Sequence, residues 1–524
     1  MDKSRKRWIL AGGGAATIAV VVAGAVVLWS GTGAAPVGAE PERRVPPSAV
    51  AQQFVTAIAA GQAGQAASVT DAVGVAGAAI AKTQQGMPGA TYHARLGPAP
   101  GVAEGATTAT IDADVTWTLP GGAPFAYPVE VEVRLVGDRW RVHWSPALLH
   151  PRLTEGQGLA YSATSGDGAL LDRTGAPVAA DFAPLVMGTV RQAVGPLTGT
   201  PGWRVAVVDA AGAPVSVLQE QEPQVARSMT VTLDPKVQAA AQAAVDQVGQ
   251  AAAVVALQKD GEVLAVAQNA PADGVGRIAL ENWFEPGSTF KVVTAAAALA
   301  GGSARVDTPV ACPGKATIGT RQITNDDSFD LGTVPLHRAF AASCNTSFSR
   351  LAADLPADAL PNAAAYFGLM SDFTVAGITT NTGKVVPAES VAERVEAGIG
   401  QGDVLATPFG MALVAATVAN GRTPVPQLIR GIPTEGQAPA ALPGGITSAL
   451  RSMMGEVVTS GTAQELAGFG GVRGKTGTAQ FGDGARAHGW FVGYRGDLAF
   501  AVLVVGGGSS KVAVSTTASF LSGL

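Results

Sequence analysis

Residues 285–302 read EPGSTFKVVTAAAALAGG. Pro286 and Gly287 favour a tight turn, and the Val- and Ala-rich run after them favours a helix that the last two glycines can end. Ser288 is therefore expected in the first helical turn, with Lys291 one turn later on the same face. A desolvated lysine can take the proton of a serine hydroxyl, and the backbone N–H of Ser288 can stabilise an oxyanion. This stretch predicts a nucleophilic serine with its own base.

Ser-x-x-Lys is a weak pattern alone, because a capping serine followed by a solvent-exposed lysine is common. Two further motifs strengthen it. Ser343-Cys344-Asn345 follows the helical stretch LHRAFAA, and the run 473–479 (RGKTGTA) precedes the strand pattern GWFVGY. Ser-x-x-Lys, Ser-x-Asn and Lys-Thr-Gly in this order are typical of penicillin-recognising serine acyl-transferases.

Each motif supplies a distinct group to such a reaction. Ser343 is expected to pass a proton between Lys291 or Lys475 and the leaving amine, and Asn345 to bind the backbone amide of the substrate. Lys475 supplies positive potential for a substrate carboxylate.

The strand that follows Lys475 completes the expected site. Thr476 and Thr478 offer hydroxyls to the carboxylate, and Gly477 leaves room for a substrate to lie along the strand. The backbone N–H groups of Ser288 and Thr478 form the expected oxyanion hole.

With these motifs, the chain resembles a monofunctional class B penicillin-binding protein, a D,D-transpeptidase of cell-wall synthesis. Residues 228–524 carry further similar blocks: TLDPKVQAAAQAAV, VVALQKDGEVLAVA, GIGQGDVLATPFGMALVAATVANG, VTSGTA and HGWFVGY. The resemblance implies an antiparallel sheet with helices on both faces plus a helical subdomain. It also implies acyl transfer through Ser288, peptidoglycan stems ending in D-Ala-D-Ala as substrate, a D,D-carboxypeptidase side activity, covalent inhibition by β-lactams and no cofactor. A SEDS-type glycosyltransferase is the partner that such enzymes generally have.

The region 47–152 has a different pattern. The stretch 49–60 predicts one amphipathic helix, and the alternating segments 106–119, 127–137 and 139–145 predict a curved antiparallel sheet around it. RWRVHWSPALLHPRL resembles the end of the nuclear-transport-factor-2-like module of low-affinity enzymes similar to the staphylococcal resistance transpeptidase. No acid or cysteine is evidently paired with His143 or His150, so a spacer or protein-contact role is expected.

Between these regions, residues 153–227 are expected to form a pedestal or dimerisation-like region. Within it ALLDRTGAPVA resembles the pedestal consensus of the family, without the upstream Arg-Gly pair. The whole chain is therefore expected to be an α+β protein.

The N-terminus predicts export. A basic tail at 1–7 precedes an uncharged apolar run at 8–29, which is about as long as a bilayer-spanning helix, and a Gly- and Pro-rich linker follows at 30–46. By the positive-inside rule, the tail is expected in the cytoplasm and the catalytic domain outside the cell membrane. The alternative is a long signal peptide that is cleaved near Ala34 or Ala35.

Composition excludes several other classes. The 524 residues are 47% hydrophobic and 14% charged, with a net charge of -5, which does not favour nucleic-acid binding. Two cysteines and five histidines, without zinc-ligand spacing, predict no metal site. A phosphate loop at Lys475-Thr476 would need a glycine where the chain has Phe469. Outside the membrane, Cys312 and Cys344 are expected either to form a disulfide or to remain two buried thiols.

Three alternatives share part of this pattern. A β-lactamase or a β-lactam sensor uses the same Ser-Lys chemistry but does not need some 250 residues before the nucleophile. A bifunctional synthase needs a glycosyltransferase domain, whose sequence elements are missing before residue 230. A non-catalytic cell-wall scaffold has no need for Ser288, Lys291, Ser343, Asn345 and Lys475 together. The role in division, elongation or sporulation, the oligomeric state and the strength of antibiotic resistance stay open.

Overall fold

A computed structural model describes residues 45–98, 101, 103–482 and 484–524. They form two compact units. The first comprises the described residues up to Ala160 together with Ala206–Ser216, and the second comprises Tyr161–Val205 together with Val217–Leu524. The expected tail and membrane helix, at 1–7 and 8–29, lie outside the described residues. Within the described ranges, no helix combines the length and the apolar character that crossing a bilayer requires.

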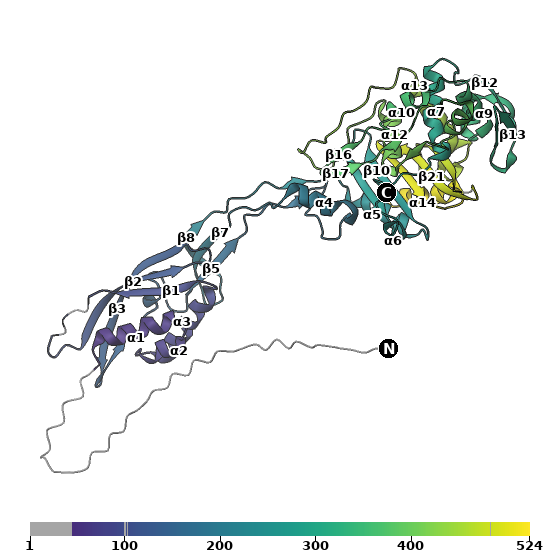
Figure 1. Cartoon of the computed structure of the whole chain (residues 1–524). Coiled ribbons are helices and arrows are strands. Elements are labelled where there is room, and N and C mark those ends of the chain that lie inside the picture. Colours follow the sequence, from purple (N-terminus) through teal and green to yellow (C-terminus); the bar gives the residue numbers. More distant parts are fainter. Residues whose placement is uncertain (1–44, 99–100, 102, 483) are drawn as a thin grey trace, which may run out of the picture. The chain divides into compact units, whose positions relative to one another are not determined.

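The first unit packs helices against a curved sheet (Figure 1). The antiparallel sheet has the order β1-β2-β3-β4, and in β2 buried residues alternate with more exposed ones, as expected for a strand with one covered face. The helices are α1 (Pro47–Ala59), α2 (Ala63–Ser68) and α3 (Val73–Gly86). The strands are β1 (Thr91–Leu96), β2 (Thr108–Thr118), β3 (Pro124–Val136) and β4 (Arg139–Val142), followed by the 3-10 turn η1 (Pro146–Leu148).

The expectation of a single helix in this region is wrong, because α2 and α3 accompany α1. Both additional helices consist mainly of Ala, Gly and Gln, so they lack the strong apolar periodicity that marks α1. Buried Ala76 and Ile80 nevertheless give α3 a narrow packing face.

Residues 158–230 contain short strands and one helix. The strands β5 (Gly158–Thr164), β7 (Gly202–Val208) and β8 (Pro214–Gln221) form a sheet of order β5-β7-β8. The strands β6 (Leu170–Leu171) and β9 (Met229–Thr230) pair in parallel. Helix α4 (Pro184–Val194) lies between β6 and β7 in sequence.

A five-stranded antiparallel sheet forms the centre of the second unit, with the order β11-β10-β22-β21-β20. Every residue from Ala252 to Leu257 in β10 is buried, so both faces of this strand are covered. Helices α5 and α14 pack against each other, α5 on β10 and β11 and α14 on β20, β21 and β22, while α12 packs on β10, β21 and β22. The elements are β10 (Ala252–Gln258), β11 (Val263–Gln268), β20 (Val472–Phe481), β21 (Arg486–Arg495), β22 (Leu498–Val504), α5 (Pro235–Asp246), α12 (Pro408–Asn420) and α14 (Ser510–Ser522).

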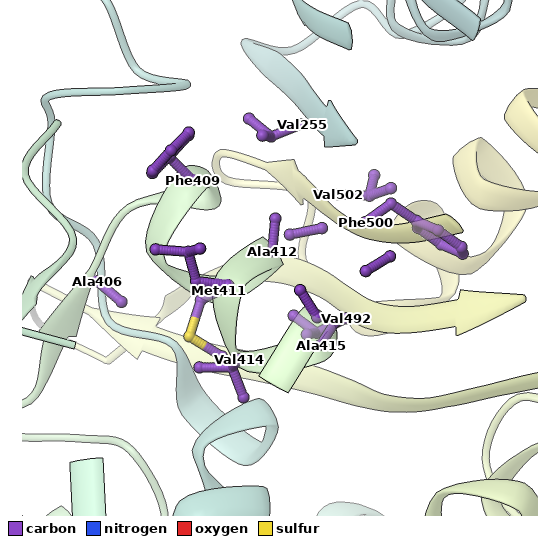
Figure 2. Close-up of a cluster of buried hydrophobic side chains, with 14 of the residues drawn as sticks. Val255, Ala406, Phe409, Met411, Ala412, Val414, Ala415, Val492, Phe500 and Val502 are labelled. Carbon is purple, nitrogen blue, oxygen red and sulfur yellow. The ribbon is translucent and has the colours of Figure 1, made fainter. Parts of the chain in front are cut away.

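The main core lies between this sheet and α12. Figure 2 shows Phe409, Met411, Ala412 and Ala415 of α12 beside apolar side chains of the central strands, which include Val255, Val492, Phe500 and Val502. Helix α12 is buried on nearly all sides, so its sequence PFGMALVAATVAN is apolar throughout.

The remaining helices and several two-stranded pairs form the helical part of this unit. The helices are α6 (Ala270–Asp273), α7 (Lys291–Ala300), α8 (Leu336–Ala341), α9 (Asn345–Ala353), α10 (Ala359–Ala365), α11 (Val391–Ala397) and α13 (Ile446–Thr459). The 3-10 turns are η2 (Gly287–Phe290), η3 (Asp326–Ser328) and η4 (Gln464–Phe469). The pairs are β12 (Pro309–Cys312) with β15 (Gly332–Pro335), β13 (Lys315–Ile318) with β14 (Arg321–Thr324), β16 (Phe373–Val375) with β17 (Ile378–Thr380), and β18 (Gly383–Lys384) with β19 (Leu405–Ala406).

Candidate active site

Ser288 lies in the 3-10 turn η2, which leads directly into α7. Two hydrogen bonds fix this turn from outside: Trp490 Nε1 donates to Glu285 O over 2.9 Å, and Gly287 N donates to Gly400 O over 2.9 Å. The Ser288 side chain is half-buried and lines a cleft, and no protein group in the described parts of the chain bonds its hydroxyl. A tethered backbone thus presents a free hydroxyl.

Glycines allow neighbouring segments to approach this turn closely. A Cβ on Gly400 would lie 2.1 Å from Gly287 O, and a Cβ on Gly477 would lie 2.9 Å from Pro286 O. Gly287 itself has a φ of 52°, which glycine adopts without strain. The expected reason for Gly477 was space for a substrate, whereas here the missing side chain makes room for the nucleophile turn.

Lys291 extends from the start of α7 into the protein and has no exposed surface. Its Nζ donates to Ser343 O over 2.6 Å, to Asn345 Oδ1 over 2.7 Å and to Ser343 Oγ over 3.3 Å. Burial, and then the neighbouring ammonium of Lys475, hold the pKa of Lys291 well below its usual range. A lowered pKa makes the neutral amine more accessible, as a general base requires.

Lys475 reaches the same hydroxyl from β20 and is also fully buried. Its Nζ donates to Ser343 Oγ over 2.9 Å and to Thr476 O over 3.0 Å. Burial lowers the pKa of Lys475 to about 7. Among the described residues, no carboxylate forms an ion pair with either lysine; instead Lys291 Nζ lies 5.6 Å from the Phe348 ring centroid and Lys475 Nζ 5.7 Å from that of Phe340.

Ser343 connects the two lysines from the sharp turn between α8 and α9. Its φ of 62° is left-handed, which is uncommon for a residue with a side chain and occurs preferentially at functional sites. This conformation lets its carbonyl face Lys291 while its hydroxyl contacts both ammonium groups. The sequence alone does not reveal this geometry.

The cleft in front of these groups has a volume of about 920 Å³. Several predicted site residues line it: Ser288, Ser343, Asn345, Thr476 and Thr478. Lys291 and Lys475 lie behind this lining. These five residues present hydroxyl and amide groups to the cleft, with the two lysine side chains one layer deeper, while charged side chains also line it: Arg321, Asp326, Asp327 and Glu396.

Neighbouring segments hold the two threonines of the cleft. The hydroxyls of Thr476 and Thr462 are 2.5 Å apart, and Thr478 Oγ1 accepts a hydrogen bond from Ser510 N over 3.1 Å. Thr462 and Ser510 also line the cleft, and neither was selected from the sequence. Thr462 belongs to the block VTSGTA, which was noted only as a resemblance.

Cys312 and Cys344 form a disulfide, with Cα atoms 6.1 Å apart. Both residues are fully buried beside Ala339. The bridge connects the middle residue of Ser343-Cys344-Asn345 to the end of β12. One catalytic motif is thereby attached covalently to the segment that leads into the cleft wall.

Two histidines differ in their surroundings. The expectation that His143 lacks an acidic partner is wrong, because its Nδ1 lies 2.6 Å from Asp71 Oδ2. The two residues are 72 positions apart, so only the fold brings them together. His488 is in β21 and stacks on Phe481; burial and then Arg486 lower its pKa to about 4.

The sheet, the helical part and the three converging motifs define a mixed α/β transpeptidase fold with an additional N-terminal domain. A sequence model of the penicillin binding protein transpeptidase domain matches residues 251–521, more than half of the chain, and a model of the NTF2-like N-terminal transpeptidase domain matches residues 46–157. The chain belongs to the penicillin-binding protein transpeptidase family.

Individual relatives match a little under half of the chain. The peptidoglycan D,D-transpeptidase PbpA of Mycobacterium tuberculosis is 34% identical over 261 residues, which cover 45% of this chain and 53% of the relative. The protein of the same name from Mycolicibacterium smegmatis is 33% identical over 258 residues, covering 44% of this chain and 51% of the relative. The chain thus spans about half the length of the curated relatives it matches.

Solved structures agree in fold. Penicillin-binding protein A from M. tuberculosis, as a ceftriaxone acyl-enzyme complex, has a TM-score of 0.50 and 28% identity, covering 56% of this chain and 80% of that one. PBP2 from Pseudomonas aeruginosa has a TM-score of 0.54 and 22% identity, covering 69% of this chain and 96% of that one. The second likeness concerns the fold alone.

Proposed function

We propose that the protein is a peptidoglycan D,D-transpeptidase that forms an acyl-enzyme on Ser288 and is inhibited covalently by penicillin. The observation that carries this proposal is the convergence of two buried lysines on the Ser343 hydroxyl, directly behind the cleft that Ser288 lines. Burying two cations without a carboxylate partner destabilises a fold, so a chemical role explains them best. The PbpA relatives carry the name of this activity.

In the first half of the reaction, Ser288 Oγ attacks the carbonyl carbon of the penultimate D-Ala of a donor stem. Lys291, as the neutral amine, takes the hydroxyl proton, and the backbone N–H groups of Ser288 and Thr478 stabilise the oxyanion. The C–N bond to the terminal D-Ala breaks, and its amine takes a proton that passes through Ser343. An ester on Ser288 remains.

In the second half, a primary amine of an acceptor stem attacks the ester carbonyl. It loses its proton through the same lysines and Ser343, a new amide bond forms, and Ser288 recovers its hydroxyl proton. Water in place of the amine gives the D,D-carboxypeptidase side reaction. Asn345, Thr476 and Thr478 bind the donor, and Lys475 supplies positive potential for its carboxylate.

Structural details support this assignment, with one adjustment. The Lys291 ammonium bonds Ser343 and Asn345 but not Ser288, so the base must reorient or deprotonate before it takes the Ser288 proton. Catalytic hydrogen bonds are often completed only when substrate binds. Because Lys475 is buried, the Thr476 and Thr478 hydroxyls are the groups that contact a carboxylate directly.

The proposal extends to location and organisation. The sequence favours a membrane anchor at 8–29 with a cytoplasmic tail at 1–7, a linker at 30–46, an NTF2-like domain at 47–152, a pedestal at 153–227 and the catalytic domain at 228–524 outside the membrane. A SEDS-type glycosyltransferase is the proposed membrane partner. Extraction of membranes at alkaline pH tests the anchor: a protein released without detergent would contradict it.

A fluorescent penicillin distinguishes the proposal from its alternatives. A transpeptidase gives a long-lived covalent adduct on Ser288 and cross-links D-Ala-D-Ala stems. A β-lactamase hydrolyses the drug rapidly, a sensor forms the adduct without any cross-linking, and a scaffold gives no adduct. Mass spectrometry of the labelled peptide identifies the acylated residue.

A further inference from the structure

Asn325 is a buried amide that neither the motifs nor the proposed mechanism uses. It follows β14 directly, precedes η3, and is 2% exposed beside the cleft. A buried amide requires several hydrogen bonds to offset the loss of water. The bonds that its oxygen accepts come from the start of the helix that carries Asn345.

The Asn325 oxygen caps the helix that begins at Asn345. Its Oδ1 accepts hydrogen bonds from Asn345 N over 2.8 Å and from Thr346 N over 3.1 Å. The local N-cap residue Cys344 makes no capping bond with its side chain, so the first N–H groups of α9 would otherwise lack partners. An asparagine 20 residues away in sequence thus acts as the N-cap.

The nitrogen of the Asn325 side chain donates hydrogen bonds to a different segment of the chain. Its Nδ2 donates to Pro313 O over 3.0 Å and to Phe329 O over 2.9 Å. These carbonyls belong to the two ends of the cleft-wall segment, which we define as residues 313–331. The side chain therefore connects this segment to the start of α9.

The adjacent residue of the same segment fixes the side chain of Asn345. Asn345 Nδ2 donates to Thr324 O over 3.0 Å, which orients Asn345 Oδ1 toward Lys291 Nζ, 2.7 Å away. The backbone and the side chain of Asn345 are thus both held by Thr324 and Asn325. A continuous series of hydrogen bonds leads from Asn325 to the lysine that serves as base in the proposed reaction.

We propose that Asn325 is a positioning residue for acyl transfer, which holds Asn345 and through it Lys291 in the arrangement that the reaction needs. This inference rests on the proposed function. The disulfide between Cys312 and Cys344 connects the same two segments, but it fixes the backbone at Cys344 and does not orient the Asn345 amide. Asn325 therefore has a role that the covalent bridge cannot replace.

Replacing Asn325 by Ala tests this role, with Asn362→Ala as the matched control, because Asn362 is exposed and its side chain bonds Asp358 alone among the residues that the structure describes. We expect Asn325→Ala to lower the acylation rate constant with a fluorescent penicillin about 10- to 100-fold, since small misplacements of catalytic groups have effects of this size. Asn325→Asp keeps an acceptor for α9 but loses the Nδ2 donors. Its acylation rate constant should therefore lie between those of the wild type and Asn325→Ala. The control should acylate like the wild type.

The pH profile separates positioning from simple stabilisation. Asn345 Oδ1 favours the charged form of Lys291, so the midpoint of the acylation profile should move to lower pH in Asn325→Ala. The groups that face Lys291 are Lys475 from β20, Ser343 from the α8–α9 turn, and Asn345 and Phe348 from α9. A purely structural role would reduce the fraction of protein that can be labelled while its rate constant and midpoint stay unchanged, and that result would overturn the inference.

A double-mutant cycle with Asn345→Ala completes the test. If Asn325 acts through Asn345, the double variant should be no slower than Asn345→Ala, whereas fully additive losses would contradict this route. If Asn325→Ala does not fold, a wild-type rate constant in Asn325→Asp is sufficient to overturn the inference. Absence of a Ser288 adduct in the wild type would refute the proposed function instead, so the two failures are distinguishable.

Discussion

The two units each bury a polar cluster. The cluster in the N-terminal unit is uncharged, whereas the one in the catalytic unit contains two lysines. In the N-terminal unit, Tyr127 accepts a hydrogen bond from Trp117 Nε1 over 3.0 Å and donates one to Leu149 O, beside the buried His150 ring. Burial, with a smaller contribution from Arg152, lowers the pKa of His150 to about 4, so this cluster is neutral at pH 7. In the catalytic unit, Lys291 and Lys475 are buried against one hydroxyl.

This difference indicates which cluster was selected for packing and which for chemistry. Neutral groups with their hydrogen bonds satisfied can be buried at little cost, whereas two adjacent ammonium groups disfavour each other and the fold. Replacing a group in the first cluster should therefore affect stability alone. Replacing a lysine in the second should impair acylation and can stabilise the protein.

The largest expected effect is the loss of acylation in Ser288→Ala. Only one hydroxyl is removed, so the circular dichroism spectrum and the melting temperature should remain those of the wild type. Mass spectrometry after penicillin treatment should find no adduct. An adduct on another residue would show that the nucleophile has been misassigned.

Replacing Lys291 should have the next largest effect. Loss of general-base assistance typically slows a reaction by about 10² to 10⁴, so Lys291→Ala should acylate that much more slowly. Lys291→Met should be equally slow, yet its melting temperature should not fall, because an apolar chain replaces a buried cation beside Lys475. Wild-type acylation by either variant would exclude Lys291 as the base.

Removing the disulfide should lower the free energy of unfolding while changing the acylation rate constant little. In the chain-entropy description, a bridge that closes 32 residues contributes about 3 to 4 kcal/mol. The double variant Cys312→Ser, Cys344→Ser should lose about this much free energy of unfolding in a denaturant titration, while Asn325 still holds α9. Non-reducing peptide mapping of the wild type provides the control: free thiols at both positions would mean that the bridge does not form.

In the N-terminal unit, Tyr127→Phe should destabilise the fold without changing acylation. The change leaves Trp117 Nε1 and Leu149 O without their partner, which typically costs about 1 to 3 kcal/mol. Thermal unfolding and penicillin labelling of the same preparation measure the two effects. A slower acylation rate constant in this variant would show that the two clusters are not independent.

The most gradual effect is a change of stability with pH, at most about 1.4 kcal/mol per pH unit for each group. The folded-state pKa of His150, about 4, lies below the usual histidine value of 6.5, so its contribution to stability is complete above pH 6.5 and is lost as the pH falls toward 4. The pKa of Lys475 is lowered in the folded state as well, from 10.5 to about 7. The free energy of unfolding should therefore rise from pH 7 to pH 9. His150→Gln should flatten the acidic slope and Lys475→Met the alkaline one; unchanged slopes would contradict both assignments.

The sequence predicts the groups of the proposed reaction because motif order and local structure are short-range properties. Ser288 and Lys291 are three residues apart, and the Lys475 segment is part of a strand that alternation predicts, so both sites follow from local pattern. The sequence predicts less of the first unit. Its helices α2 and α3 are Ala- and Gly-rich, and the His143–Asp71 pair joins residues that are distant in sequence.

The sequence by itself predicted the groups that react in the proposed mechanism, a helix behind Ser288 and a fold that mixes helices with a sheet, because these predictions depend on residue type and on spacings of a few positions. Only the tertiary structure decided how the groups interact. The left-handed turn at Ser343, the packing of Gly477 against Pro286 and the cap that Asn325 provides all depend on contacts between segments far apart in the chain. Burial also comes from the whole fold, and it is burial that lowers the pKa of Lys475 to about 7.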